Sequence, residues 1–273
     1  MKQIFTILFV VISLVNQAQV TDSAFALVKT YNGEIAAAAL DKLDNLYIIS
    51  STGQVKKFGA KGDSVGVFNG IRNYGKLSSI DVSNPLKPLL FYKDFSTVVV
   101  LDRFLANRAS INLRQYNVLQ PTAIGLSYDN NIWVFDQFDY KLKKVDESGN
   151  LLLQTDDFRQ LFGQSFAPQK IINDNGLVYL ADSASGIFVF DNYGTYKRKI
   201  LLKNWSTIDV WNGMVVRVSN NAILVYNPTN FTERSLNFPA SFTPYLHAFT
   251  NTNKLVTFSP DSLRIYLFGA QQK

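Results

Sequence analysis

Residues 176–200 read GLVYLADSASGIFVFDNYGTYKRKI, and the fold class can be predicted from this pattern. A turn glycine precedes an apolar run with a tyrosine, and a polar turn, a second apolar run, another turn and a basic run follow it. Short runs of β-branched and aromatic residues between turns of Gly, Asn, Asp and Ser predict consecutive antiparallel strands. The stretch therefore predicts a meander of short strands.

The same pattern recurs along the chain. Residues 45–65 (NLYIISSTGQVKKFGAKGDSV) and 131–155 (NIWVFDQFDYKLKKVDESGNLLLQT) repeat it clearly, and weaker copies begin near Pro88, Met214 and Lys254. Equivalent apolar positions recur about every 40 residues, at Tyr47, Phe91, Trp133, Tyr179, Val216 and Val256. This period is typical of one four-stranded blade of a β-propeller.

The repeats predict an all-β, six-bladed β-propeller. A single blade has apolar residues on both faces, so it becomes stable only between neighbouring blades. In the third copy we expect strands, from the axis outward, at 123–128, 132–136, 142–146 and 151–154. The last copies fit the pattern loosely, so five or seven blades remain open.

Basic residues lie on the strands that we expect near the rim of the blades. Charge on an edge strand prevents pairing with other chains. The residues concerned are Lys56, Lys57, Lys141, Lys143, Lys144, Lys197, Arg198 and Lys199.

The repeat resembles that of the NHL-type and related six-bladed β-propeller families. In those families a turn ending in Asn or Gly leads into an apolar strand with Tyr or Trp, then a turn and a strand of the form V-x-x-F. The copies that begin at residues 45, 131 and 176 are similar to this form, and the last repeats fit it loosely because Val216 and Val256 replace the aromatic residue. The resemblance covers nearly all of the chain after its N-terminal segment. It implies the propeller fold and no particular activity.

The ring also needs closure, because an open ring exposes a sheet edge. The segment Phe25 to Thr30 (FALVKT) precedes the first predicted innermost strand, and the last repeat ends at Phe268 with a short tail. We expect this segment to supply the outermost strand of the final blade.

The N-terminus has the order of a secretory signal peptide. Lys2 precedes an apolar run from Ile4 to Val15, and Ala18 follows in a polar stretch. The run is shorter than the roughly 20 residues that span a bilayer, so a membrane anchor is the weaker alternative. We therefore expect a signal peptide over 1–18 and one propeller domain over 19–273. The protein would then be exported and soluble, in the periplasm, associated with an outer membrane, or outside the cell, with no later transmembrane segment.

Composition excludes several chemistries. The chain has no Cys and one His, which excludes disulfides, thiolate metal sites, a Cys nucleophile and multi-histidine metal sites. No Ser has a nucleophile-elbow sequence around it, so His247 is expected to be a packed or surface residue. The sequence therefore favours a non-enzyme without metal or cofactor. Glu34 stands where calcium-dependent lactonase propellers have a metal ligand, but the Pro and Trp that accompany it in that family are absent.

Two segments depart from the repeat and are expected to be insertions. Leu101 to Gln120 would connect the second blade to the third, and Gln154 to Pro168 the third to the fourth. In the second segment Phe158, Leu161 and Phe162 share one face at helical spacing, which predicts a short helix. Arg and aromatic residues are enriched at the centres of interfaces. The candidate binding residues are Arg103, Arg108, Arg114, Phe158, Arg159 and Phe162. Alternatively, both segments only cover their own propeller.

These observations favour an exported, non-catalytic β-propeller that serves as an interaction or scaffold module of a bacterial cell envelope. Its expected partner is another envelope protein. The formal net charge of +6 keeps an anionic glycan or surface open, and nucleic acid is not expected for an exported protein. The alternative is a propeller that binds a small ligand or sugar in its axial channel, including a calcium-dependent lactonase-like hydrolase.

Overall fold

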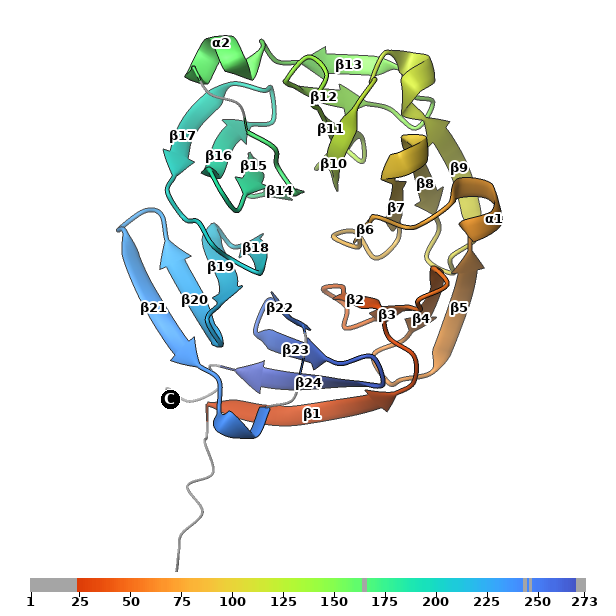
Figure 1. The fold of residues 1–273 in the computed structure, drawn as a ribbon, viewed down its shortest axis with the longest axis vertical. Helices are drawn as coiled ribbons and strands as arrows, with labels where there is room; N and C mark the ends of the chain where they lie inside the picture. Colours follow the sequence, from red (N-terminus) through yellow and green to blue (C-terminus); the bar gives the residue numbers. More distant parts are fainter. Residues whose placement is uncertain (1–23, 164–165, 243–244, 246, 269–273) are drawn as a thin grey trace, which may run out of the picture.

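Each predicted repeat forms one four-stranded antiparallel sheet, and six sheets surround a common axis in the computed structural model (Figure 1). The structure describes residues 24–163, 166–242, 245 and 247–268. The predicted signal peptide lies outside these residues. The six-bladed β-propeller is confirmed, and the choice among five, six and seven blades is settled.

The first three blades follow one another along the chain, each built from its innermost strand outward. Blade 1 contains β2 (Ala37–Leu40), β3 (Leu46–Ile49), β4 (Gln54–Phe58) and β5 (Ser64–Asn69). Blade 2 contains β6 (Ser79–Asp81), β7 (Leu89–Tyr92), β8 (Thr97–Leu101) and β9 (Asn107–Asn112). Blade 3 contains β10 (Pro121–Leu126), β11 (Ile132–Asp136), β12 (Lys141–Val145) and β13 (Leu151–Gln154).

The other blades repeat this order, except that the last takes its outermost strand from the N-terminal end. Blade 4 contains β14 (Lys170–Asp174), β15 (Leu177–Asp182), β16 (Gly186–Asp191) and β17 (Tyr196–Ile200). Blade 5 contains β18 (Thr207–Trp211), β19 (Met214–Ser219), β20 (Ala222–Asn227) and β21 (Thr232–Asn237). Blade 6 contains β22 (His247–Asn251), β23 (Lys254–Phe258), β24 (Ser262–Phe268) and β1 (Phe25–Asn32).

Short helices occupy links on one side of the ring. The links between blades contain α1 (Ile71–Tyr74), η2 (Leu113–Tyr116), α2 (Phe158–Phe162) and η3 (Ala240–Phe242), and the β7–β8 turn contains η1 (Lys93–Phe95). No helix of the described residues is both long enough and apolar enough to cross a membrane.

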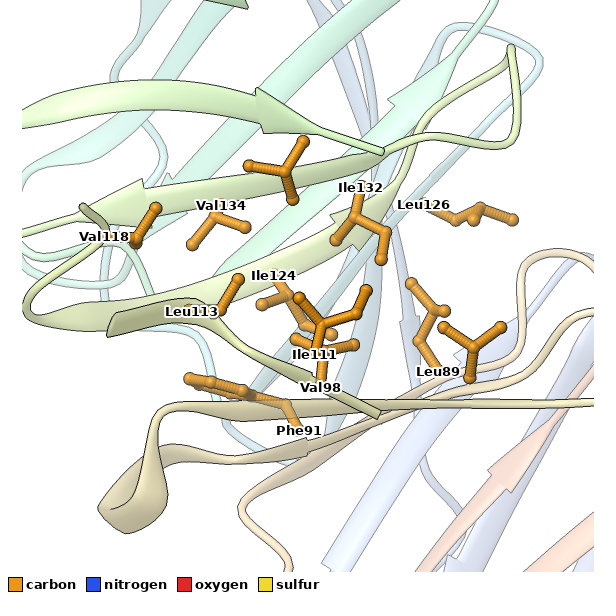
Figure 2. Close-up of a cluster of buried hydrophobic side chains, with 12 residues drawn as sticks. Leu89, Phe91, Val98, Ile111, Leu113, Val118, Ile124, Leu126, Ile132 and Val134 are labelled. Carbon is orange, nitrogen blue, oxygen red and sulfur yellow. The ribbon is translucent and has the colours of Figure 1, made fainter. Parts of the chain in front are cut away.

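The apolar core lies between the blades. All six equivalent positions of the repeat, from Tyr47 to Val256, fall on second strands and are at most 1% exposed. On β11, Ile132 and Val134 pack towards blade 2, and Trp133 and Phe135 pack towards blade 4. Figure 2 shows the cluster between blades 2 and 3. Each blade is therefore covered on both sides, as the alternation of these residues predicts.

The predicted closure is confirmed. β1 pairs antiparallel with β24 from Phe25 opposite Phe268 to Asn32 opposite Ser262, with one irregularity after Leu27. Figure 1 shows β1 and β24 side by side at the outer edge of blade 6. The chain then crosses to the axis and begins blade 1, so the ring closes through a sheet built from both ends of the described chain.

Two expectations were wrong. The segment Leu101 to Gln120 is not an insertion, because it contains β9, the outermost strand of blade 2, and η2. Of the eight basic residues expected near the rim, those of β4 and β12 lie on third strands, covered by a fourth strand, and only Lys197, Arg198 and Lys199 of β17 lie on an outermost strand. Lys57, Lys143 and Lys144 are buried, since their long side chains reach carbonyl and carboxylate oxygens at the blade ends.

The antiparallel order places the connections on two faces of the ring. We call the lower face the side that carries the turns between first and second strands and between third and fourth strands. The upper face carries the turns between second and third strands and the links between blades. This division decides which candidate residues can act together.

Candidate functional site

The innermost strands line the axis, where burial and neighbouring charges act on one carboxyl group. Asp209 on β18 is half-buried, with 28% of its side chain exposed, and Lys170 Nζ on β14 lies 3.6 Å from Asp209 Oδ1. Burial raises the pKa of Asp209, Asp81 on β6 of the opposite blade raises it further, and Lys170 opposes both. Across the described ranges no three His, Asp or Glu side chains form a group that could hold a metal ion.

We expect Asp209→Asn to stabilise the protein at neutral pH. A carboxyl group whose pKa is raised by folding destabilises the folded protein when it is ionised. This loss of unfolding free energy is complete above the pKa of the folded state and disappears below the pKa of the unfolded state. The free energy of unfolding should rise by about 0.5–2 kcal/mol at about pH 7, and the gain should shrink towards about pH 4. Denaturant titration at both pH values measures it. Asp94→Asn, an exposed carboxylate on the upper face, is the control; no gain from Asp209→Asn at neutral pH would contradict the assignment.

Glu34 and His247 meet at the upper face, where blade 6 adjoins blade 1. Glu34 Oε1 accepts hydrogen bonds from Ser51 N at 3.1 Å and from Ser51 Oγ. These bonds lower the pKa of Glu34. His247 begins β22, is exposed and stacks on Phe258 with ring centroids 5.0 Å apart. Both residues line one pocket with a volume of about 260 Å³.

The structure separates the six candidate binding residues. Arg103 in the β8–β9 turn and Arg108 on β9 lie towards the lower face, and Arg108 is 3.8 Å from Glu147 of the β12–β13 turn. Arg114 follows β9 on the upper face, where its Nε donates to Ser96 Oγ at 3.1 Å. The residues of α2 also belong to the upper face, between blades 3 and 4. The six residues therefore do not form one surface.

The predicted helix is confirmed as α2, with Asp157 accepting a hydrogen bond from Arg159 N at its N-terminus. Phe158 is fully buried and Phe162 packs against the same cluster between blades 3 and 4. Leu161 is exposed instead of sharing their buried face. The two phenylalanines of α2 thus cover a blade junction, and Arg159 is the accessible candidate of this helix.

A different set of residues stands out on the lower face. In four turns an Asp or Asn side chain accepts the N–H of the residue two positions later, which fixes the turn, and that residue is large and apolar. The pairs are Asp41 with Leu43, Asn84 with Leu86, Asp102 with Phe104, and Asp191 with Tyr193. The four apolar side chains are between 54% and 77% exposed. Leu43, Leu86 and Phe104 belong to the adjacent blades 1 and 2, and we call them the lower-face patch; Tyr193 lies on the same face but on blade 4, beyond blade 3.

These turns do not need an apolar side chain. In the β12–β13 turn, Asp146 accepts the N–H of Ser148 at 2.8 Å in the same way, and Ser148 is small, polar and exposed. One similar turn, with Phe138, lies on the upper face. The apolar residues of the patch therefore expose surface that the fold does not require.

Buried lysines hold the turns of the patch in place. Lys57 Nζ on β4 donates to Arg103 O at 2.8 Å and to Pro85 O at 3.4 Å, which joins two turns of blade 2 to blade 1. Lys87 binds Asn130 O and, at 2.6 Å, Glu147, and Lys144 Nζ reaches Asn192 O at 3.3 Å. Burial lowers the pKa of Lys57, and Asp41 and Asp102 oppose this effect. The patch is thus presented on a rigid frame.

Sequence reasoning missed this patch, although a signal was present. At each of the four places an Asp or Asn at the end of a strand or in the turn after it is followed two positions later by Leu, Phe or Tyr. The pattern is short and common in turns, so by itself it does not indicate a binding surface. It indicates one only when the fold shows that the four turns lie on one face of the ring.

Comparison with known proteins supports the fold. No protein-family model matches the chain, and no curated protein matches it in sequence. The chain resembles solved propellers. A streptogramin B lyase structure has 13% identity and a TM-score of 0.56, with 84% of this chain and 78% of that chain covered. A catalytically inactive virginiamycin B lyase from Staphylococcus aureus with quinupristin has 8% identity and a TM-score of 0.57, covering 89% and 99%.

A third structure is similar to the same degree. BBS1N, solved in complex with ARL6DN, has 10% identity and a TM-score of 0.58, with 91% of this chain and 98% of that chain covered. At identities this low, the likeness shows the fold and assigns no family. Propellers serve many functions on one scaffold, so the function has to be argued from the surface of this chain.

Proposed function

We propose that this protein is an exported, non-catalytic interaction module of a bacterial cell envelope, which binds another envelope protein through the lower-face patch. The N-terminal sequence pattern of residues 1–18 supports export, and the NHL-like form of the repeat is compatible with a scaffold role. The observation that carries the proposal is the patch itself. Exposed apolar groups on fixed turns lose little conformational entropy on binding, which favours docking.

The charge near the patch suggests the chemistry of the partner. The Arg103 guanidinium lies 4.6 Å from the Phe104 ring centroid, and Lys42 precedes Leu43 in an exposed position. Arg beside an aromatic side chain is typical of an interface centre. A partner with apolar side chains and carboxylates would complement this surface.

We expect the triple variant Leu43→Ser, Leu86→Ser, Phe104→Ser to lose the partner while keeping its fold. Serine at these positions copies the β12–β13 turn, so the melting temperature should stay within a few degrees. Cross-linking of the tagged protein in native envelopes, followed by mass spectrometry, should show a loss of about tenfold or more in the cross-linked partner, as for removal of interface anchors.

The matched control removes as many exposed apolar side chains from the upper face, through Phe95→Ser, Phe138→Ser and Leu161→Ser. This variant should keep the partner. Arg103→Glu should weaken cross-linking and Arg159→Glu should not, because the two residues lie on opposite faces. If the upper-face variant alone lost the partner, or if neither did, the lower face would not be the docking surface.

A further inference from the structure

A small pocket lies where the ring closes, on the face opposite the proposed docking surface. It has a volume of about 260 Å³ and is lined by Glu34, Ile35, Ala36, Ser51, His247 and Pro260. These residues come from blade 6, from blade 1 and from the link between β1 and β2. We call this cavity the seam pocket.

The walls of the seam pocket are fixed by the backbone. Gly33 N donates to Asp261 O at 2.9 Å, Ile35 N to Pro260 O at 2.8 Å, and Ala36 N to Ile49 O at 2.8 Å. The link is thus pinned to blade 6 on one side and to blade 1 on the other. The cavity is a built feature of the seam between them.

The pocket contains a carboxylate with an unused oxygen. Ser51 donates its N–H and its hydroxyl to the same oxygen of Glu34, Oε1. Glu34 is exposed, and among the described residues no group donates to its Oε2 and no Lys or Arg lies within ion-pair distance of it, although the charge of Lys56 on β4 helps to lower its pKa. An ionised carboxylate has room for several hydrogen bonds, so Glu34 can accept a further charged donor.

The rest of the pocket suits the body of a small organic molecule. Ile35 is buried beneath it, and Ala36 and Pro260 add apolar surface. The imidazole of His247 is held at a second wall by its stacking on Phe258. One fixed anion beside an aromatic ring and apolar walls is the combination that receives an alkyl chain with a cationic end.

We propose that the seam pocket binds an organic cation, an alkylammonium or guanidinium group that donates to Glu34 Oε2 while its alkyl chain rests on Ile35 and Pro260. The volume is below that of pockets for drug-sized ligands, so the ligand is the size of an amino-acid side chain. The source is either a small free organic cation or a Lys or Arg side chain of a peptide. The net charge of +6 repels cations from the surface in general, so uptake has to depend on this one carboxylate.

The test is a titration of the full propeller with n-butylguanidinium, followed by amide chemical shifts in NMR. We expect saturable shifts centred on Ile35, Ser51 and His247, and weaker binding by about tenfold in Glu34→Gln, since a charge-assisted hydrogen bond is lost. Asp94→Asn removes an exposed carboxylate of the same face outside the pocket and should change the affinity by less than about twofold. Because the ligand contacts both blades at the seam, it should also raise the melting temperature.

Neutral and anionic probes decide the chemistry. Binding of n-butanol or butyrate as tight as that of n-butylguanidinium would overturn the proposal, and so would unchanged binding in Glu34→Gln. Ala36→Leu fills the seam pocket without changing its charge, so it should abolish binding of n-butylguanidinium. This variant tests the proposal if Glu34→Gln does not fold. An acetylated Gly-Arg-Gly amide that binds more tightly than n-butylguanidinium would identify a peptide side chain as the source, and weaker binding would identify a small free organic cation.

Discussion

A chain that begins at Gly33, and so lacks β1, is expected to melt at least about 10 °C below the full propeller. The loss removes the strand that covers β24 over its whole length, together with Phe25, whose ring lies 5.2 Å from Phe242 and 6.3 Å from Phe268 between centroids. Burial of one phenylalanine contributes about 1.5–3 kcal/mol, and the exposed edge of β24 adds unpaired backbone groups. A total of about 5 kcal/mol corresponds to the expected shift at this chain length. Differential scanning calorimetry measures it.

The matched control begins at Ala24 and keeps β1. Its melting temperature should equal that of the full chain of residues 1–273. A synthetic peptide of residues 25–32 (FALVKTYN) added to the truncated protein should restore part of the loss, because it can pair with the open edge of β24. Truncated and control proteins that melt together would show that the ring does not depend on this strand.

Phe158→Ala should cost about 3–5 kcal/mol of unfolding free energy, as for large aromatic side chains removed from a core. The Phe158 ring is fully buried. It stacks on Phe190 with centroids 5.0 Å apart and an interplanar angle of 6°, and on Phe166 at 5.5 Å and 11°. No neighbouring backbone can move easily into the space, because the ring lies between two blades. Urea titration of the purified protein measures the change.

Leu161→Ala is the control for Phe158→Ala, since it removes an apolar side chain from the same helix. Leu161 is 49% exposed, so the expected change is within about 0.5 kcal/mol. A large loss from Leu161→Ala, or a small one from Phe158→Ala, would contradict the packing of α2. The two variants also distinguish an effect on stability from an effect on partner binding. If Phe158→Ala loses the partner and Leu161→Ala keeps it, the weakened blade junction explains the loss.

The strands were predictable where local pattern and packing agree. In blade 3, the predicted ranges 132–136 and 151–154 match β11 and β13 without a shift, because turn residues bound each apolar run closely. The innermost strand begins two residues earlier than expected, at Pro121, which pairs with Asp136 across an irregularity in register. The spacing in α2 predicts one buried face with Phe158, Leu161 and Phe162, but only the two phenylalanines pack into the blade junction and Leu161 is exposed beside them.

The candidate site was harder to predict, since it depends on the placement of distant segments. Arg103 and Arg114 are close in sequence, yet β9 runs between them and carries them to opposite faces. The local pattern predicts Lys57 as a charge on an edge strand, but Lys57 is buried because carbonyl oxygens 28 and 46 residues away accept its hydrogen bonds. Neither the opposite placement of the two arginines nor the hydrogen bonds of Lys57 can be predicted from the residues next to them in the sequence.

The repeat, the strand order within each blade and the closing strand can be predicted from the chain, because alternation of apolar residues and turn chemistry act over a few residues. The assembled ring determines which turns share a face, which lysines are buried between blades, and that Glu34, Ser51 and His247 line one pocket. Those relations arise when the ring closes, since closure brings β1 beside β24 and the link after β1 against blade 6. Contacts between segments so far apart in the chain follow from the geometry of the closed ring, which no single repeat contains.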